Sequence, residues 1–343
     1  MVWHDRTMKI LITGHTGFKG SWLVLYLTLL GHQVCGIAKN PPSRSLFNSA
    51  EIKKHLFLDQ RLDIRNSKKL LAGIKTMQPD AVIHLAAQSL VLESFKNPRE
   101  TYETNFMGTF NILDASMQVD SIKNILIITS DKVYTNTNLA KEFIETDSLG
   151  GGDPYSNSKA IADILTQNWV KTRNDFNIGI LRAGNVIGGG DFASNRLVPD
   201  IIEAYKTSSK IKIRNPQATR PWQHVFECLE GYEKALDFVS KGNSGIWNIG
   251  PSIENNITVE EFLAKCSIFL GKEIKVDQNR EKYNEKNFLA LSTSKAKQEL
   301  NWQPKFTIDE SIEKTLSWYK KERKYPDSML QFSISQLQDF LEQ

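Results

Sequence analysis

The sequence of 343 residues has few cysteines, no long hydrophobic run and no large excess of either charge. Its longest apolar stretch, residues 22–30, is too short to span a bilayer, and residues 1–7 contain no signal-peptide core. The net charge of +4 is small, and no dense run of Lys and Arg is present to bind a nucleic-acid backbone. We therefore expect a cytoplasmic protein whose partners include neither a membrane nor a nucleic acid.

Cysteine and histidine are too few and too scattered to predict a metal site. The three cysteines, Cys35, Cys228 and Cys266, are an odd number without metal-ligand spacing, and the six histidines contain no closely spaced ligand pair. Cys35 falls in an apolar segment that predicts a buried strand. We expect all three cysteines to be reduced thiols of the core, and we expect no metal.

What the sequence does contain is a regular alternation of apolar strands and helices. Hydrophobic residues make up 40% and charged residues 24%, which is ordinary for a globular protein of one large or two modest domains. Strands are expected at residues 8–13, 33–38, 56–62, 81–85, 123–129, 177–182 and 245–250, and helices at 21–30, 66–75, 101–117, 155–173, 197–205, 227–239, 258–270, 292–300 and 308–323. Residues 135–152 read as a long polar loop, and the tail from residue 325 reads as a polar helix. The alternation predicts an α/β fold, a Rossmann-like doubly wound parallel sheet.

A glycine-rich turn follows the first expected strand directly. Gly14, Gly17 and Gly20 lie between that strand and the first helix, which is the arrangement of a dinucleotide-binding loop. Gly14 would permit the tight turn, Gly17 the approach of a pyrophosphate, and Gly20 close packing of helix on strand. A purely structural turn is the alternative, but the position in the chain favours a bound dinucleotide.

The second strand ends in Lys39 and Asn40, where NAD-binding folds often have an Asp or Glu that holds the ribose hydroxyls. The local sequence therefore leaves NAD and NADP both open. Lys39 and Arg44 would either contact a 2′-phosphate or be solvated loop charges.

The ends of the third and fourth strands supply further candidates. Asp63 and Ile64 follow the third strand, where an adenine edge would be met unless the strand simply turns there. Ala86 and Ala87 follow the fourth strand and are small enough for a cofactor to lie close to the backbone.

Tyr155 and Lys159 are four residues apart and would share one face of a helix that begins near Pro154. An ammonium group beside the phenol favours the phenolate, which can take a proton from a substrate hydroxyl while a hydride leaves the same carbon. The spacing alone would also arise by chance on a solvated helix. It gains weight from Ser130-Asp131-Lys132, which follows the fifth strand at the sheet edge where ligands bind in this architecture.

Longer motifs make the sequence similar to a known family. They are residues 14–22 (GHTGFKGSW), 182–191 (RAGNVIGGGD), 196–200 (RLVPD), 220–225 (RPWQHV) and 302–306 (WQPKF) before a helix that ends in Trp318-Tyr319. Together with the glycine turn, Ser130-Asp131-Lys132 and Tyr155-x-x-x-Lys159, they resemble the extended short-chain dehydrogenase/reductases that act on nucleotide sugars. Within that family, nearly the whole chain is similar to the CDP-glucose 4,6-dehydratase branch.

The resemblance implies an organisation and a cofactor. It implies tightly held NAD that is regenerated in each turnover, so the missing acid on the second strand does not by itself indicate NADP. It implies an NAD-binding domain of residues 8–184 with about 224–250, and a smaller, interleaved C-terminal substrate domain of residues 185–223 and 251–343. It also implies a homodimer or higher homo-oligomer, formed through the helices near residues 101–117 and 155–173.

The resemblance also assigns residues to roles. Cofactor-binding residues would be Gly14, Thr16, Gly17, Phe18, Lys19, Gly20, Asp63, Ile64, Leu85, Ala86, Ala87, Tyr155 and Lys159; catalytic residues Ser130, Asp131, Lys132, Tyr155 and Lys159; substrate-binding residues Gln88, Ser130, Asn185, Arg196 and Arg220. Arg220 matches the arginine that neutralises the diphosphate, and a forked guanidinium suits that role. Val91-Leu92 departs from the basic residues that related chains tend to carry, which leaves the local substrate contacts open.

The implied reaction converts CDP-glucose to a 4-keto-6-deoxy sugar and water. By analogy, Tyr155 with Lys159 takes the C4 hydroxyl proton, Ser130 binds the C4 oxygen, Asp131 protonates the C6 oxygen, and Lys132, if neutral, takes the C5 proton. An ion pair with Asp131 is the alternative role for Lys132. Three alternative functions remain. The protein could be a 4,6-dehydratase for another nucleotide sugar, a 4-epimerase or a non-catalytic NAD-binding scaffold. A 4-epimerase would need no acid and base at C5 and C6.

Overall fold

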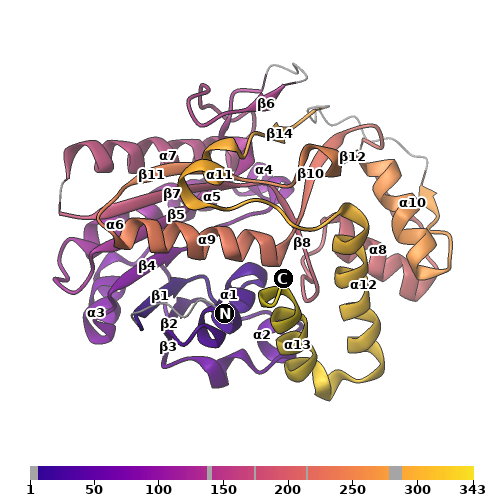
Figure 1. Cartoon of the computed structure of the whole chain (residues 1–343), viewed down its shortest axis with the longest axis horizontal. Coiled ribbons are helices and arrows are strands. Elements are labelled where there is room, and N and C mark those ends of the chain that lie inside the picture. The colour runs from indigo at the N-terminus through magenta and orange to yellow at the C-terminus, as the bar shows by residue number, and fades with distance from the viewer. Residues whose placement is uncertain (1–6, 137–140, 174, 214, 278–287) are drawn as a thin grey trace.

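The computed structural model describes residues 7–136, 141–173, 175–213, 215–277 and 288–343. Residues 1–6 at the start of the chain, and residues 137–140 within the expected loop, lie outside the described residues. The described part is built around a seven-stranded sheet with the strand order β11-β7-β5-β4-β1-β2-β3 (Figure 1). The strand order reverses between β1 and β4, and such a switch point is where doubly wound sheets bind ligands.

The seven strands of this main sheet all run parallel to their neighbours. They are β1 (Lys9–Thr13), β2 (Gln33–Ala38), β3 (Leu58–Arg61), β4 (Ala81–His84), β5 (Asn124–Ile128), β7 (Asn177–Ala183) and β11 (Gly245–Ile249). The central strands β4 and β5 are buried along their whole length, as expected of parallel strands that are covered on both faces. The predicted doubly wound sheet is therefore confirmed.

Helices cover both faces of the main sheet (Figure 1). On one face, α1 (Phe18–Leu29) and α9 (Val225–Ser240) pack on the apolar side chains of the strands. On the other face, α3 (Ser67–Met77), α6 (Gly108–Ser116) and α7 (Pro154–Thr172) do the same. Each layer buries an apolar helix stripe against the sheet, which supplies the hydrophobic free energy that holds the three layers together.

The helix expected at residues 101–117 contains an irregular turn. It is formed by α5 (Pro98–Tyr102), a π-helical turn at Glu103–Met107 and α6, in continuous succession. The π turn contains Asn105, whose side-chain amide donates to the Gln88 carbonyl at 2.9 Å and to the Ser158 hydroxyl at 2.9 Å. This irregular turn therefore ties the helix both to the loop after β4 and to α7, and such turns are frequent at functional sites.

A second layer lies beside the carboxyl ends of the strands (Figure 1). Its sheets join β8 (Asn185–Ile187), β10 (Thr219–His224) and β12 (Asn256–Thr258), and β9 (Ile211–Lys212) with β13 (Val276–Asp277); its helices are α8 (Leu197–Thr207), α10 (Val259–Leu270) and α12 (Ile308–Lys324). Thr258 begins α10 with the predicted capping box, in which Thr258 and Glu261 satisfy each other's backbone N–H groups. Thr307 begins α12 in the same way with Glu310.

The chain passes between the main sheet and the second layer more than once. It leaves β7 for β8, α8 and β10, returns through α9 to β11, leaves again for β12 and α10, and comes back as α11 (Ser294–Leu300) against α9 and β11. The Glu227 carboxylate on α9 binds the segment that follows α11, because its Oε1 accepts from the backbone N–H groups of Lys305 and Phe306 at 2.7 and 2.8 Å. The two parts are thus interleaved along the chain.

Two expectations about the less regular segments were wrong in part. Residues 135–152 are not loop alone, because β6 (Glu142–Phe143) pairs in parallel with β14 (Ala290–Leu291) from far along the chain. The tail contains the expected helix, α13 (Met329–Leu341), but this helix is not polar all round, because it buries Met329, Leu337 and Phe340. Both features depend on contacts between residues distant in the sequence.

Short helices complete the described chain. They are α2 (Leu46–Ser49), α4 (Val91–Lys96) and the 3₁₀ turns at Ile52–His55, Asp131–Val133, Ile253–Asn255 and Pro326–Ser328. All three cysteines are buried thiols without a disulfide, as expected. Among the residues that the structure describes, no helix combines the length and the apolar character needed to cross a membrane.

Candidate active site

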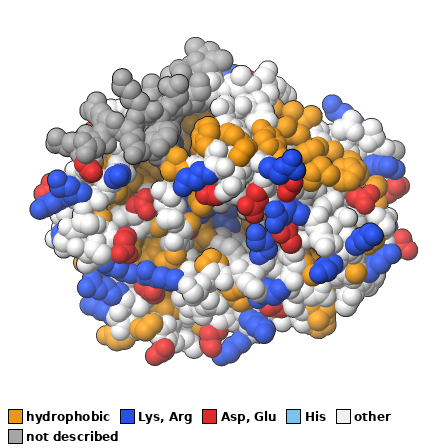
Figure 2. Space-filling model, turned by 180° about the vertical axis from the view of Figure 1, so that it is seen from behind, with side chains coloured by type: hydrophobic (Ala, Val, Ile, Leu, Met, Phe, Trp, Pro, Cys, Tyr) orange, Lys and Arg blue, Asp and Glu red, His pale blue; other side chains and the backbone are white. Residues whose placement is uncertain are grey.

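A deep cleft lies between the carboxyl ends of the main-sheet strands and the second layer. Its lining includes all the residues proposed for the site except Lys159, from the glycine turn at one side to Asn185, Arg196 and Arg220 at the other. Viewed from behind, the molecule is hollowed near its centre, with basic and acidic side chains at the rim (Figure 2). The fold therefore brings together residues that are far apart in the chain.

The glycine turn fits a dinucleotide closely. Gly14 has a φ of +78°, and a Cβ there would lie 2.8 Å from the backbone of Ala86. A Cβ on Gly20 would lie 2.3 Å from the Gly14 carbonyl oxygen, whereas one on Gly17 would meet only that oxygen, at 3.3 Å. Gly17 is therefore the glycine whose backbone faces the open cleft at the N-terminus of α1, where N–H groups and the helix dipole favour a phosphate.

The expected adenine end of the cleft holds charged residues that already have partners. Asp63 forms a bidentate contact with Arg65, with an Nη2–Oδ2 distance of 2.7 Å, and this contact lowers the pKa of Asp63. Lys39 lines the cleft 3.7 Å from Glu100, whereas Arg44 is paired with Glu322 at 3.4 Å and stacks on a ring of the second layer. Arg44 thus pairs within the protein and is not among the residues that line the cleft, whereas Lys39 is.

Tyr155 and Lys159 lie on the first turns of α7. Asp153 caps this helix with a 2.9 Å hydrogen bond from the Ser156 N–H, and Pro154 occupies its first turn. Lys159 is buried, and its Nζ donates to the carbonyl of Ile128 on β5 at 3.0 Å. Burial lowers the pKa of Lys159 to about 7 and raises the pKa of Tyr155 to about 12.

These two pKa directions refine the expectation for the pair. Burial disfavours both the ammonium of Lys159 and the phenolate of Tyr155, so each group loses its charge more readily here than in water. The Ser130 hydroxyl and the charge of Arg196 act in the opposite direction and lower the pKa of Tyr155. Activation of Tyr155 by Lys159 remains a prediction.

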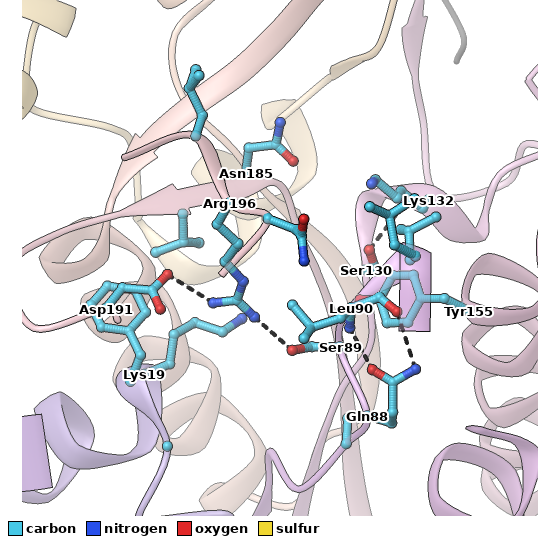
Figure 3. A pocket seen from close by; sticks show the side chains of 18 of the residues that line it. Lys19, Gln88, Ser89, Leu90, Ser130, Lys132, Tyr155, Asn185, Asp191 and Arg196 are labelled. Carbon is cyan, nitrogen blue, oxygen red and sulfur yellow. Dashed lines mark hydrogen bonds and ion pairs between the residues drawn. The ribbon is translucent and has the colours of Figure 1, made fainter. Parts of the chain in front are cut away.

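Ser130 and Asp131 follow the end of β5 and line the cleft, and Figure 3 shows Ser130 close to Tyr155. The Ser130 hydroxyl donates to Asp131 Oδ1 at 3.0 Å and accepts from the Lys132 backbone N–H at 3.2 Å. Asp131 is only 2% exposed, and its Oδ2 has no hydrogen-bond partner among the described residues. Burial raises the pKa of Asp131, although Lys132, Ser130, Arg220 and Lys19 counteract the shift.

Lys132 is half-buried and lines the same cleft. Figure 3 shows its side chain beside Ser130 and on the same side of the cleft as Tyr155. The alternative of a close Lys132–Asp131 ion pair is not what the described structure has, because Asp131 Oδ1 accepts from Ser130 and Oδ2 is without a partner. Lys132 therefore acts on the pKa of Asp131 from a distance rather than through a hydrogen bond.

Arg196 crosses the cleft from the second layer. Its Nη1 donates to Asp191 Oδ2 at 2.9 Å and its Nη2 to the Ser89 hydroxyl at 2.6 Å, so it bridges the second layer and the loop after β4 (Figure 3). Sequence reasoning missed both partners. Asp191 is the last residue of the motif at 182–191, and Ser89 comes soon after Ala86 and Ala87. The fold brings both of them to Arg196, which the sequence alone does not show.

The other expected substrate residues also lie on the cleft. Asn185 begins β8 and pairs with Trp222 of β10, while Arg220 lies two residues before that tryptophan and donates to the Thr219 carbonyl at 2.9 Å. The Gln88 side chain is engaged within the protein: its Nε2 donates to the Leu90 carbonyl at 3.1 Å, and its Oε1 accepts from the Leu90 N–H at 2.6 Å. Contact between Gln88 and a substrate remains a prediction, and its observed role is to hold the loop.

Lys19 has a position that the sequence did not indicate. It lies between Gly17 and Gly20 at the start of α1, and its Nζ donates to the Tyr232 hydroxyl of α9 at 3.2 Å. Burial lowers the pKa of Lys19, and its charge lowers the pKa of both Asp131 and Lys159. A second cation thus lies near the catalytic candidates.

Known proteins resemble this chain over most of its length. A curated CDP-glucose 4,6-dehydratase from Salmonella typhimurium is 39% identical over 329 residues, covering 91% of this chain and 90% of that protein. The solved structure of dTDP-glucose 4,6-dehydratase from Bacillus anthracis in complex with NAD is 25% identical, with a TM-score of 0.80 over 93% of this chain and 98% of that chain.

A 4-epimerase shares the same fold. The structure of UDP-glucose-4-epimerase from Stenotrophomonas maltophila, with bound NAD and formylated UDP-arabinopyranose, has a TM-score of 0.83 at 22% identity, over 92% of this chain and 99% of that chain. The family model for GDP-mannose 4,6 dehydratase matches residues 11–315, which include the glycine turn, Ser130-Asp131-Lys132 and Tyr155-x-x-x-Lys159. The chain therefore belongs to the GDP-mannose 4,6 dehydratase family.

Proposed function

We propose that the protein is an NAD-dependent 4,6-dehydratase that converts CDP-glucose to CDP-4-keto-6-deoxyglucose and water. The observation that carries the proposal is Asp131: a buried carboxyl with a raised pKa and an oxygen without a partner among the described residues, beside Ser130 and Tyr155 in one cleft. A simple 4-epimerase has no use for an acid at this position. The 39% identity to a CDP-glucose 4,6-dehydratase supports the choice of substrate.

The reaction needs a ketone before water can leave. The C5 proton of a hexose is not acidic until C4 is oxidised, because only then does the electron pair left at C5 become part of an enolate. NAD, when bound, supplies the chemistry for this, since it accepts the C4 hydride and returns it to C6 at the end of the same turnover. The protein must hold the sugar beside the cofactor and must move three protons.

Tyr155 acts at C4. Its Oη takes the proton of the C4 hydroxyl, and the Ser130 hydroxyl hydrogen-bonds the same oxygen. Lys159 stands one helical turn behind Tyr155 and, when protonated, stabilises the phenolate. Its bond to the Ile128 carbonyl fixes the ammonium group to the strand that leads to Ser130.

Asp131 and Lys132 act at C6 and C5. Protonated Asp131 Oδ2 donates its proton to the departing C6 hydroxyl, which leaves as water, while Lys132 Nζ, in its uncharged form, takes the C5 proton. Lys132 returns that proton to C5 as the hydride reaches C6. At this point Tyr155 has gained one proton and Asp131 has lost one, so the total charge is unchanged. Transfer of a proton from Tyr155 to Asp131 through solvent then restores both groups for the next turnover.

The remaining lining residues divide between the two ligands. We assign the cofactor to residues 8–184 with about 224–250, where Gly14, Gly17 and Gly20 cradle the pyrophosphate, and the sugar nucleotide to residues 185–223 and 251–343. Arg220 and Arg196 supply guanidinium groups for the diphosphate, a geometry that matches a forked donor to phosphate oxygens. When substrate binds, Arg196 would give up its hydrogen bond to the Ser89 hydroxyl and donate to the diphosphate instead.

The protein also presents an apolar face suited to a second copy of the chain. Phe95 of α4, Met107 of the π turn and Ile164 of α7 are 58%, 42% and 51% exposed, and these elements pack on one another. Hydrophobic side chains also gather at the upper right of the face seen in Figure 2. A homodimer through these helices would bury such side chains, and Ile164→Glu should convert it to a monomer in analytical ultracentrifugation.

The test of the function is direct. Purified protein is incubated with CDP-glucose, UDP-glucose, dTDP-glucose and GDP-glucose, and the products are identified by NMR. A 4-keto-6-deoxy sugar formed fastest from CDP-glucose is expected. Formation of the 4-epimer instead, or retention of NAD without turnover of any of the four, would refute the proposal in favour of an epimerase or a non-catalytic scaffold.

A further inference from the structure

A buried ion pair lies directly behind the catalytic candidates, outside the cleft lining. Asp163 is on α7, one turn beyond Lys159, and Arg182 is on β7. Arg182 Nη2 donates to Asp163 Oδ1 at 2.8 Å and Nε donates to Oδ2 at 2.9 Å, and both side chains are 0% exposed. Such a bidentate pair fixes geometry as well as charge.

The same carboxylate is bound to the catalytic strand. The Thr129 hydroxyl, on the residue before Ser130, donates to Asp163 Oδ2 at 2.9 Å, and the Thr129 N–H donates to the Leu181 carbonyl of β7 at 2.9 Å. Gln167 donates to Asp163 Oδ1 at 2.8 Å. Asp163 therefore joins three elements at one point: the helix of Tyr155, the strand end of Ser130, and β7.

Arg182 also binds the segment that follows Ser130 in the chain. Its Nη1 donates to the Tyr134 hydroxyl and to the Glu145 carbonyl, both at 2.9 Å. The Tyr134 hydroxyl donates in turn to Asn248 Oδ1 of β11 at 2.6 Å. The segment that begins with Ser130 is thus held at its start through Thr129 and four residues later through Tyr134.

We propose that Asp163, held by Arg182 and Thr129, is the positioning residue that fixes the helix of Tyr155 and Lys159 against the strand end of Ser130 and Asp131. Positions within a fraction of an ångström matter for proton transfer, so this buried clamp sets the rate of the chemical step without touching substrate. This inference deepens the proposed function and rests on it.

The clamp also places charge near Lys159. Asp163 is the negative group that raises the pKa of Lys159, opposing burial and the charge of Lys19 on α1, both of which lower it. Burial and the Lys159 charge lower the pKa of His84 on β4 to about 3, which keeps that imidazole neutral. Arg182 neutralises much of the field of Asp163, so removal of the Asp163 charge leaves an additional unpaired cation near Lys159.

The decisive experiment compares two substitutions of one residue. Thr129→Val removes one hydrogen bond to Asp163 and leaves the ion pair intact, and Thr129→Ser restores the hydroxyl. Thr166→Val is the matched control, because Thr166 is a buried hydroxyl of the same helix that donates to the Ala162 carbonyl rather than to Asp163. The measurements are kcat and KM for CDP-glucose, and hydrogen exchange of the peptides 129–135 and 154–163.

Thr129→Val should lower kcat about tenfold with KM unchanged within about twofold, and should speed exchange in both peptides. Thr129→Ser and Thr166→Val should keep kcat within about threefold of the wild type. Full kcat in Thr129→Val with unaltered exchange would overturn the inference. If the wild type does not convert CDP-glucose, the proposed function fails. Hydrogen exchange in Thr129→Val, compared with Thr129→Ser and Thr166→Val, then tests by itself whether Asp163 fixes the helix against the strand end.

A second variant tests the charge. In Asp163→Asn, the loss of the negative group should move the alkaline limb of the pH profile of single-turnover hydride transfer to lower pH, because the Lys159 ammonium is then less stable. An unmoved limb in the folded variant would contradict the electrostatic part of the inference. If Asp163→Asn does not fold, the Thr129 pair still decides the positioning part.

Discussion

Replacing Asp131 with asparagine gives the sharpest test of the mechanism, because it changes one oxygen to a nitrogen at the atom proposed as the acid. Asp131 Oδ1 accepts from Ser130, and Oδ2 is buried without a partner among the described residues. The side-chain amide introduced by Asp131→Asn keeps the size and the Ser130 contact but cannot give a proton to a leaving hydroxyl. General acid catalysis contributes about 10²–10⁴-fold, so dehydration should slow by that factor, or about 3–5 kcal/mol of barrier.

Oxidation at C4 should survive the substitution. Tyr155 and Lys159 are unchanged, so NADH should accumulate after CDP-glucose is added, seen as its near-ultraviolet absorbance in stopped flow. In deuterated water, the C5 position should still exchange, because Lys132 remains available to take and return that proton. The stability should not fall, since a buried carboxyl without a full set of partners is replaced by a neutral group.

The control is Asp309→Asn, which removes a carboxylate that is 69% exposed on α12. It should turn over at the wild-type rate. Water release by Asp131→Asn at the wild-type rate, with no accumulated NADH, would refute the assignment of Asp131 as the acid.

Three further outcomes are expected. Lys132→Met should retain NAD but lose both water release and solvent exchange at C5, and full dehydration by this variant would exclude Lys132 as the base. Gly20→Ala should cost about 1–3 kcal/mol of unfolding free energy and lower the NAD content, because the new Cβ would lie 2.3 Å from the Gly14 carbonyl, whereas Gly152→Ala, with no atom within 4 Å of its Cβ, should be neutral in both measurements. Burial raises the pKa of Glu227 to about 7, above its unfolded value of 4.5. The free energy of unfolding should therefore decline by up to about 3 kcal/mol as pH rises from about 5 to 7. In chemical denaturation, Glu227→Gln should flatten this dependence on pH.

Local sequence patterns were sufficient for the main sheet and for the cleft residues that follow its strands. Most of the parallel strands are short apolar runs, β3 (LDQR) being the exception. The carboxyl ends of parallel strands share one edge, so Gly14, Ala86 and Ser130 had to come close once the fold class was known. The resemblance to a family supplied Asn185, Arg196 and Arg220, which no periodicity would have identified.

What sequence reasoning missed depends on contacts between distant residues. The pairing of β6 with β14 joins two-residue strands from opposite halves of the chain, too short to show a pattern. The clamp of Asp163 and Arg182 consists of two charges that read as ordinary polar positions until the helix and the strand are packed. The sequence predicted a helix in the tail, but the buried face of α13 depends on contacts that the tail makes with distant residues.

The interleaved path of the chain constrains how the protein can be made. On the ribosome, the main sheet lacks its edge strand β11 until residues 245–249 have emerged, by which time part of the second layer already exists. A gene divided after residue 184 would encode one product without β11 and another whose β11 has no neighbouring strand. Coexpression of both products, rather than either alone, would be needed to recover a complete sheet.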